Sequence, residues 1–143
     1  MHTSNTVRPY NAGNNNLDAI RKRHLRILLI DDEDRFRKAM RFNLSQKYGA
    51  EVTDVDSGKD AIGLLKAGDQ FDLIFIDLMM PGMSGTETYT ELRKIDSSCA
   101  VVLMSSYSES YEWAAAKELA VRLVSKPILG QTLTEELFRA TDN

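Results

Sequence analysis

Four apolar residues run directly into three acidic residues in the stretch Ile27-Leu28-Leu29-Ile30-Asp31-Asp32-Glu33. The same change from apolar to polar recurs three times farther along the chain, in Leu73–Asp77, Val102–Ser106 and Val124–Pro127. Short apolar runs of this kind are typical of strands that are buried on both faces of a parallel sheet. Their polar ends predict a site, because ligands of open α/β sheets bind beyond the carboxyl ends of the strands.

Helical patterns separate these strands along the chain. Strands are expected at Leu25–Ile30, Ala50–Val55, Phe71–Ile76, Ala100–Met104 and Val121–Val124. Helices are expected over about Asp34–Tyr48, Glu109–Leu119 and Gln131–Ala140. Another helix is expected to begin at its cap Ser57 and to end at Gly68, and a further one is expected to turn Tyr89, Leu92 and Ile95 toward the core. This alternation predicts an α/β fold, a five-stranded parallel sheet with helices on both faces. A short helix over Leu17–Arg23 precedes it.

Composition excludes several classes of protein. The 143 residues are 43% hydrophobic and 27% charged, which suits a globular domain, and no apolar run reaches the roughly 20 residues that a membrane span needs. Cys99 is the only cysteine, so no internal disulfide forms and a reducing cytoplasm is the expected location. Residues 1–26 carry five basic side chains against one acidic, which leaves −7 on the rest and argues against nucleic-acid binding by the folded body. The basic cluster Arg21–Arg26 is interpreted as a solvated lead-in to the first strand.

Three carboxylates at adjoining strand ends demand compensation. Asp31, Asp32 and Asp77 would meet if the first and third strands are neighbours, and two carboxylates about 5 Å apart repel by roughly 3 kcal/mol at an effective dielectric near 20. Lys126 supplies one positive charge, and a divalent cation supplies two. Hard oxygen ligands with open water positions suit Mg²⁺, so the sequence predicts a magnesium site. Helix capping alone explains one aspartate but not the three together.

An aspartate beside Mg²⁺ can act as a nucleophile toward phosphorus. The transferring group needs further donors, and two strand ends offer them. Ser105 can donate from its hydroxyl, and Lys126 can donate as a point charge. Asp77, Ser105 and Lys126 are therefore the candidate catalytic residues.

The order of these segments resembles the receiver domain of two-component response regulators. The resemblance covers about Leu25 to Thr141, and each of its segments is weak alone but specific in this order. The segments that carry it are Ile30–Glu33, Ile76–Gly85, Met104–Ser106 and Ser125–Pro127. It implies a flavodoxin-like, doubly wound sheet with strand order 2-1-3-4-5. The chain would then consist of a polar and basic extension, residues 1–23, and a receiver domain, residues 24–143, either standing alone or cut from a longer regulator.

The resemblance also implies a role for each site residue. Asp77 would accept a phosphoryl group from a phosphohistidine on a sensor histidine kinase or a histidine phosphotransfer protein. Asp31, Asp32 and Asp77, with the backbone carbonyl of Met79, would hold Mg²⁺. Ser105 and Lys126 would contact the phosphoryl oxygens, as in a domain that catalyses only its own phosphorylation and dephosphorylation and is otherwise no enzyme.

The expected output surface comprises the helix over about 109–119, the strand 121–124 and the last helix. It would bind a downstream effector protein or a second copy of the chain, with no direct contact to nucleic acid or membrane. One departure stands out, because the family commonly has Tyr or Phe three residues before the lysine and this chain has Leu123. The usual aromatic switch is therefore not expected here.

Three other readings compete. A phosphorylation-independent module with a disabled receiver site is the main alternative, and Leu123 keeps it open. A haloacid-dehalogenase-type, Mg²⁺-dependent aspartyl-phosphate phosphohydrolase should show Asp-x-Asp after the first strand, where this chain has Asp31-Asp32-Glu33-Asp34. A flavodoxin-like electron carrier would need a phosphate-binding loop at that place, where these acids repel phosphate.

Met79 leads to a first prediction. In the family, the residue two positions after the acceptor helps to set how fast water attacks the acyl phosphate, and a thioether neither orients nor activates water well. We expect slow self-dephosphorylation, and the change Met79→Asn should shorten the lifetime of the phosphorylated state. Decay of the phosphoprotein followed by mass spectrometry measures this lifetime, and an unchanged value would rule out side-chain control at this position.

Overall fold

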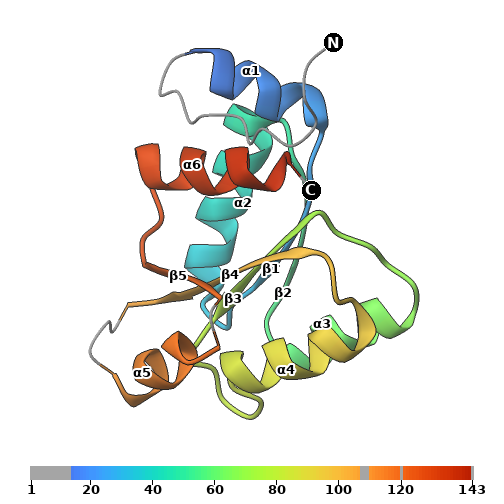
Figure 1. Ribbon diagram of the computed structural model, residues 1–143, viewed down its shortest axis with the longest axis vertical. Coiled ribbons are helices and arrows are strands. Elements are labelled where there is room, and N and C mark those ends of the chain that lie inside the picture. Colours follow the sequence, from blue (N-terminus) through green and yellow to red (C-terminus); the bar gives the residue numbers. More distant parts are fainter. Residues whose placement is uncertain (1–13, 107–109, 120, 143) are drawn as a thin grey trace.

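A five-stranded parallel sheet lies between two layers of helices (Figure 1). The computed structural model describes residues 14–106, 110–119 and 121–142. Its elements, in chain order, are α1 (Asn14–Arg23), β1 (Arg26–Ile30), α2 (Asp34–Tyr48), β2 (Glu51–Val55), α3 (Gly58–Lys66), β3 (Leu73–Asp77), α4 (Gly85–Ile95), β4 (Ala100–Ser105), α5 (Tyr111–Lys117), β5 (Arg122–Ser125) and α6 (Gly130–Ala140). The strand order β2-β1-β3-β4-β5 confirms the prediction. Within the described ranges, no helix is both long and apolar enough to cross a bilayer.

Side chains on the two faces of each central strand pack into two separate hydrophobic cores. In β1, Ile27 and Leu29 pack with α1, α2 and α6, whereas Leu28 and Ile30 pack with α3, α4 and α5. Because side chains alternate between the faces of a strand, burial on both faces requires an unbroken apolar run. This requirement explains why β1, β3 and β4 were recognisable in the sequence.

The N-terminal helix is longer than expected and belongs to one of these cores. α1 begins at Asn14, contacts α6 and α2, and buries Ile20 completely. Arg21 stays exposed, but its guanidinium donates to the carbonyls of Gln46 and Lys47, which end α2 without helical partners. The boundary predicted after residue 23 stays a prediction, and residues 1–13 lie outside the described residues.

The helices of the opposite layer are mostly placed as expected. Ser57 caps α3 by accepting from the Asp60 amide, which confirms its predicted role. The inward placement of Ile95 is wrong, because this last residue of α4 lies beyond the packed turns and is 40% exposed. α5 spans Tyr111–Lys117, shorter than expected, and the predicted start at Glu109 lies outside the described residues.

The β3–α4 connection folds back closely onto the end of β3. Ser84 and Glu87 form a reciprocal capping box at the start of α4, which satisfies two backbone amides. A Cβ at Gly85 would lie 2.4 Å from the carbonyl oxygen of Asp77 and 2.6 Å from the Cα of Leu78. Glycine is therefore required where α4 meets the backbone of the site.

This close approach yields a stability prediction. Gly85→Ala should lower the free energy of unfolding by about 2 kcal/mol or more, because backbone atoms must move to admit the methyl group. Gly63→Ala is the matched control, since a Cβ there meets nothing within 4 Å and alanine favours a helix interior by roughly 0.5–1 kcal/mol. Urea unfolding of both variants measures the two effects, and equal stabilities would contradict the expected clash.

Candidate functional site

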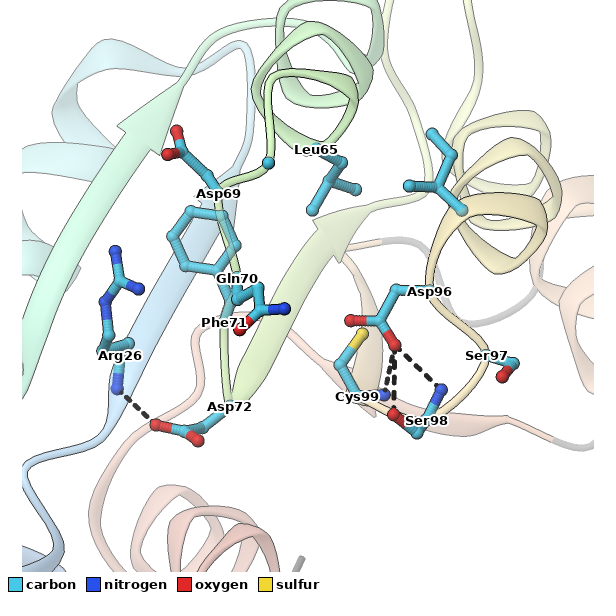
Figure 2. Close-up of a pocket in the computed structure, with 12 residues that line it drawn as sticks. Arg26, Leu65, Asp69, Gln70, Phe71, Asp72, Asp96, Ser97, Ser98 and Cys99 are labelled. Atoms are coloured by element: carbon cyan, nitrogen blue, oxygen red, sulfur yellow. Dashed lines mark hydrogen bonds between the residues drawn. The ribbon is translucent and has the colours of Figure 1, made fainter.

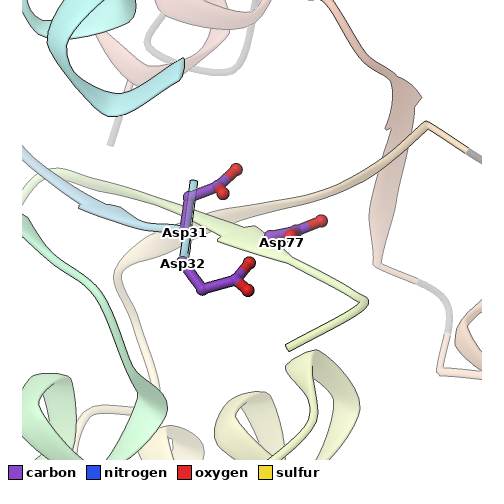
Figure 3. A group of neighbouring side chains, drawn as sticks. All are labelled: Asp31, Asp32 and Asp77. Carbon is purple, nitrogen blue, oxygen red and sulfur yellow. The ribbon is translucent and has the colours of Figure 1, made fainter. Parts of the chain in front are cut away.

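Three aspartates gather at the carboxyl edge of the sheet (Figure 3). Asp31 and Asp32 follow β1 directly, and Asp77 ends the neighbouring strand β3, where Ile30 pairs with Ile76. One oxygen from each carboxylate lies within 4.8 Å of the others, and the three carboxylates point toward the same side. Asp31 is fully buried and Asp77 is 5% exposed, whereas Asp32 faces solvent.

One ammonium compensates the buried negative charge. Lys126 follows β5, and its Nζ lies 2.7 Å from Oδ2 of Asp31, 3.1 Å from Oε1 of Glu33 and 3.8 Å from Oδ1 of Asp77. Its side chain is only 5% exposed. The strand order brings this lysine across the sheet edge to a partner 95 positions earlier in the chain.

The surroundings shift the pKa values of Asp31, Asp77 and Lys126. Burial, followed by the charge of Asp31, raises the pKa of Asp77 to about 7, although Lys126 opposes the shift. Burial also raises the pKa of Asp31, against the hydrogen bond from Lys126. For Lys126, burial alone would lower the pKa, but its carboxylate neighbours outweigh burial and raise it. The ammonium is therefore charged at neutral pH, and the charge of Asp77 is costly.

The remaining predicted site residues lie around this cluster. Ser105 is fully buried at the end of β4, one residue beyond the partner of Asp77, and its carbonyl accepts the Lys126 amide at 2.9 Å. The Lys126–Pro127 peptide is cis. The side chain of Met79 is exposed, and its backbone amide hydrogen-bonds to Asp77. The metal-ligand role of the Met79 carbonyl stays a prediction.

The donor set fits a hard divalent cation. All three side chains offer carboxylate oxygens, which Mg²⁺ prefers, and the exposed Asp32 leaves one side of the cluster open to water. The single charge of Lys126 cannot neutralise three carboxylates. A bound Mg²⁺ would be held by Asp31, Asp32 and Asp77.

Two neighbours of Lys126 were not identified as site residues from the sequence. Glu33 was noted only as part of the acidic stretch, and Phe36 lies inside the predicted helix Asp34–Tyr48. The Phe36 ring centroid lies 4.2 Å from the Lys126 Nζ, at the distance of a cation–π contact. The spacing of Glu33 and Phe36 by three residues at a helix start was the available signal, but it becomes meaningful only when the lysine is in place.

A hollow at the opposite edge of the sheet carries no comparable chemistry (Figure 2). It measures about 810 Å³ and lies at the amino ends of β1, β3 and β4. Its polar groups largely satisfy each other. Asp72 accepts from the Arg26 amide, and Asp96 accepts from Ser98 and Cys99. Burial raises the pKa of Cys99 to about 11, so this thiol is not a nucleophile at neutral pH.

The sequence is similar to that of a known protein family over the region that forms this fold. The sequence profile described as the response regulator receiver domain matches residues 27–138, which include the whole site and all five strands except the first residue of β1. The chain belongs to the response regulator receiver family. Its relatives include probable histidine kinase 4 of Oryza sativa subsp. japonica, 33% identical over 114 residues. Another is the transcriptional regulatory protein AfsQ1 of Streptomyces coelicolor, 32% identical over 108 residues.

These relatives are longer than the receiver itself. The matched part is 80% of this chain but 11% of the plant kinase, and 75% of this chain but 47% of AfsQ1. The receiver thus corresponds to a fraction of each larger protein.

Solved receiver structures share the fold. The receiver domain of the histidine kinase CKI1 from Arabidopsis thaliana, in complex with Mg²⁺ and BeF₃⁻, is 25% identical with a TM-score of 0.74, covering 90% of this chain and 96% of that one. The response regulator TrrA from Thermotoga maritima, in complex with Mg²⁺-BeF, is 28% identical with a TM-score of 0.70 and covers 81% and 98%.

The raised pKa of Asp77 yields a prediction about stability and pH. Because the pKa of Asp77 near 7 in the folded state exceeds the ordinary aspartate value of 3.8, the folded receiver binds more protons between these limits and loses stability as the pH rises through them. Asp77→Asn removes this loss. Without divalent metal, the variant should be more stable than the wild type by about 2–4 kcal/mol at pH 8, and the difference should vanish near pH 4.

Chemical denaturation at several pH values with a chelator present measures this difference. Asp69→Asn, a change at an exposed aspartate near the far hollow, is the control. If the stability difference between Asp77→Asn and the wild type does not depend on pH, this result would contradict the raised pKa of Asp77.

Proposed function

We propose that this receiver accepts a phosphoryl group on Asp77 from a phosphohistidine, with Mg²⁺ bound beside it. The observation that carries the proposal is the placement of a nearly buried aspartate between two further carboxylates and one buried ammonium. The donor would be a sensor histidine kinase or a histidine phosphotransfer protein. The family membership and the similarity to kinase receivers support this choice of donor.

The proposed chemistry is a transfer from nitrogen to oxygen. A carboxylate oxygen of Asp77 attacks phosphorus, the P–N bond to the imidazole breaks and an acyl phosphate forms. Lys126 supplies positive charge to the phosphoryl oxygens, and the Ser105 hydroxyl donates to them. Mg²⁺ held by Asp31, Asp32 and Asp77 would supply Lewis acidity and charge neutralisation. The domain would catalyse only this self-modification and its reversal, without turning over a separate substrate.

The proposed output surface combines α5, β5 and α6. Phosphorylation adds a charge of about −1.5 to −2 beside Ser105 and Lys126, and only contacts that differ between the two states can shift a conformational equilibrium. Leu123 is half-buried and lines a hollow of about 450 Å³ with Trp113 on α5. A downstream effector or a second copy of the chain would bind at this surface. We place the protein in the cytoplasm, where histidine kinases present their phosphohistidine.

Modification by a small phosphodonor tests the proposal. Incubation with Mg²⁺ and acetyl phosphate should add one phosphoryl group to the wild type, and Asp77→Asn should abolish the addition, since it removes the attacking oxygen. Intact-protein mass spectrometry provides the measurement, with Asp69→Asn as the control that should remain modifiable.

The metal requirement and the competing function are tested in the same assay. A chelator should suppress modification, because the charge of the incoming phosphoryl group would then face three carboxylates. A wild-type receiver that stays unmodified under excess donor would favour the phosphorylation-independent module instead. Steady release of phosphate from a phosphomonoester would favour the phosphohydrolase.

A further inference from the structure

The loop between β1 and α2, together with the first turn of α2, holds the Lys126 ammonium by three contacts. Asp31 and Glu33 accept from Nζ at 2.7 and 3.1 Å, and the Phe36 ring lies 4.2 Å from it. Of the three carboxylates within 4.0 Å of Nζ, that of Asp77 is the most distant, at 3.8 Å. This last distance is about 1 Å longer than a charge-assisted hydrogen bond. The lysine therefore sits on the loop side of the cluster rather than on the side of the acceptor.

Glu33 occupies a position whose usual task it does not perform. It is the N-cap residue of α2, where Ser, Thr, Asp or Asn normally accepts from an exposed helix amide, but its side chain makes no capping bond. Its carboxylate instead reaches Lys126, while its own amide donates to Oδ1 of Asp31 at 2.8 Å. Asp31 and Glu33 thus form one small network around the ammonium.

Asp31 and Glu33 differ in what can compensate their negative charge once Lys126 moves away. Asp31 is fully buried within the three-aspartate cluster, where a bound cation would take over its compensation. The Glu33 side chain is 64% exposed and belongs to no such cluster among the described residues, so water can solvate it once the lysine leaves. Of the two carboxylates that accept from Nζ, only Glu33 opposes movement of Lys126 without any role in holding the metal.

We propose that Glu33 is a positioning residue that holds Lys126 away from Asp77 in the unphosphorylated receiver. This inference rests on the proposed function. The carboxylate of Glu33 competes with the phosphoryl oxygens for the same ammonium. Phosphorylation must therefore break the contact between Glu33 and Lys126, and the strength of that contact sets part of the balance between the two states.

Fluoroberyllate, which accompanies Mg²⁺ in two similar receiver structures, serves as the probe of the phosphorylated state. Glu33→Gln should tighten its binding at saturating Mg²⁺ by about two- to fivefold, the range expected for losing one partly exposed ion pair. Isothermal titration calorimetry measures this affinity, and a separate Mg²⁺ titration shows whether metal binding has changed.

Two matched variants separate this contact from a general effect of charge. Asp34→Asn removes the same charge from the next residue, which pairs with Arg37 and Lys38 and not with Lys126. Any long-range effect should be equal in both. Glu33→Asp keeps the charge but shortens the side chain by one methylene, so it should tighten fluoroberyllate binding nearly as much as Glu33→Gln.

The outcomes distinguish the inferred role of Glu33 from the proposed phosphoacceptor function of the receiver. A gain for Glu33→Gln beyond that of Asp34→Asn, with Mg²⁺ affinity changed equally in both variants, supports the inference. Equal affinities of these two variants, or wild-type affinity in Glu33→Asp, overturn it while the proposed function stands. A wild type that neither binds fluoroberyllate nor reacts with acetyl phosphate overturns the proposed function itself.

Discussion

The contact between Lys126 and Asp31 is the interaction on which the site depends. It joins β5 to the end of β1 across the edge of the sheet, with Asp77 on the strand between β1 and β4. A buried carboxylate without this partner would carry a desolvation penalty of several kcal/mol, and two more carboxylates stand within 4.8 Å. This arrangement is tolerated because Lys126 offsets part of the desolvation and repulsion energy of the carboxylates, and a bound cation would offset the rest.

The backbone around the cluster is fixed by contacts that have no part in the chemistry. Gly85 lets the start of α4 approach the carbonyl of Asp77, and the Ser84–Glu87 capping box fixes where that helix begins. The start of α4 thus packs directly against the end of β3, which helps to keep Asp77 in place beside carboxylates that repel it.

Much of the fold was readable from the sequence because two-sided burial leaves a strong pattern. The apolar runs of β1, β3 and β4 lead into Asp31, Asp77 and Ser105, and the strand order that the resemblance implied brings these residues close to Lys126, which follows β5. The sequence did not show where α4 ends relative to the hydrophobic core. Ile95 has the spacing of a core residue, yet it occupies the last turn of α4 and lies exposed.

The same limit applied to residues whose partner is distant in sequence. Glu33 looked like an ordinary acidic neighbour, and Arg21 looked like part of a solvated basic run. Their contacts with Lys126 and with the carbonyls that end α2 exist only once the chain has folded.

The elevated pKa of Asp77 has a consequence for how this receiver would meet its metal. A group with a pKa near 7 is protonated in about half of the molecules at neutral pH. A cation and a proton then compete for the same oxygen, so uptake of the ion would release acid and the apparent affinity would grow as the solution becomes more alkaline. Binding of a cation at this site would thus be coupled to the loss of a proton from Asp77.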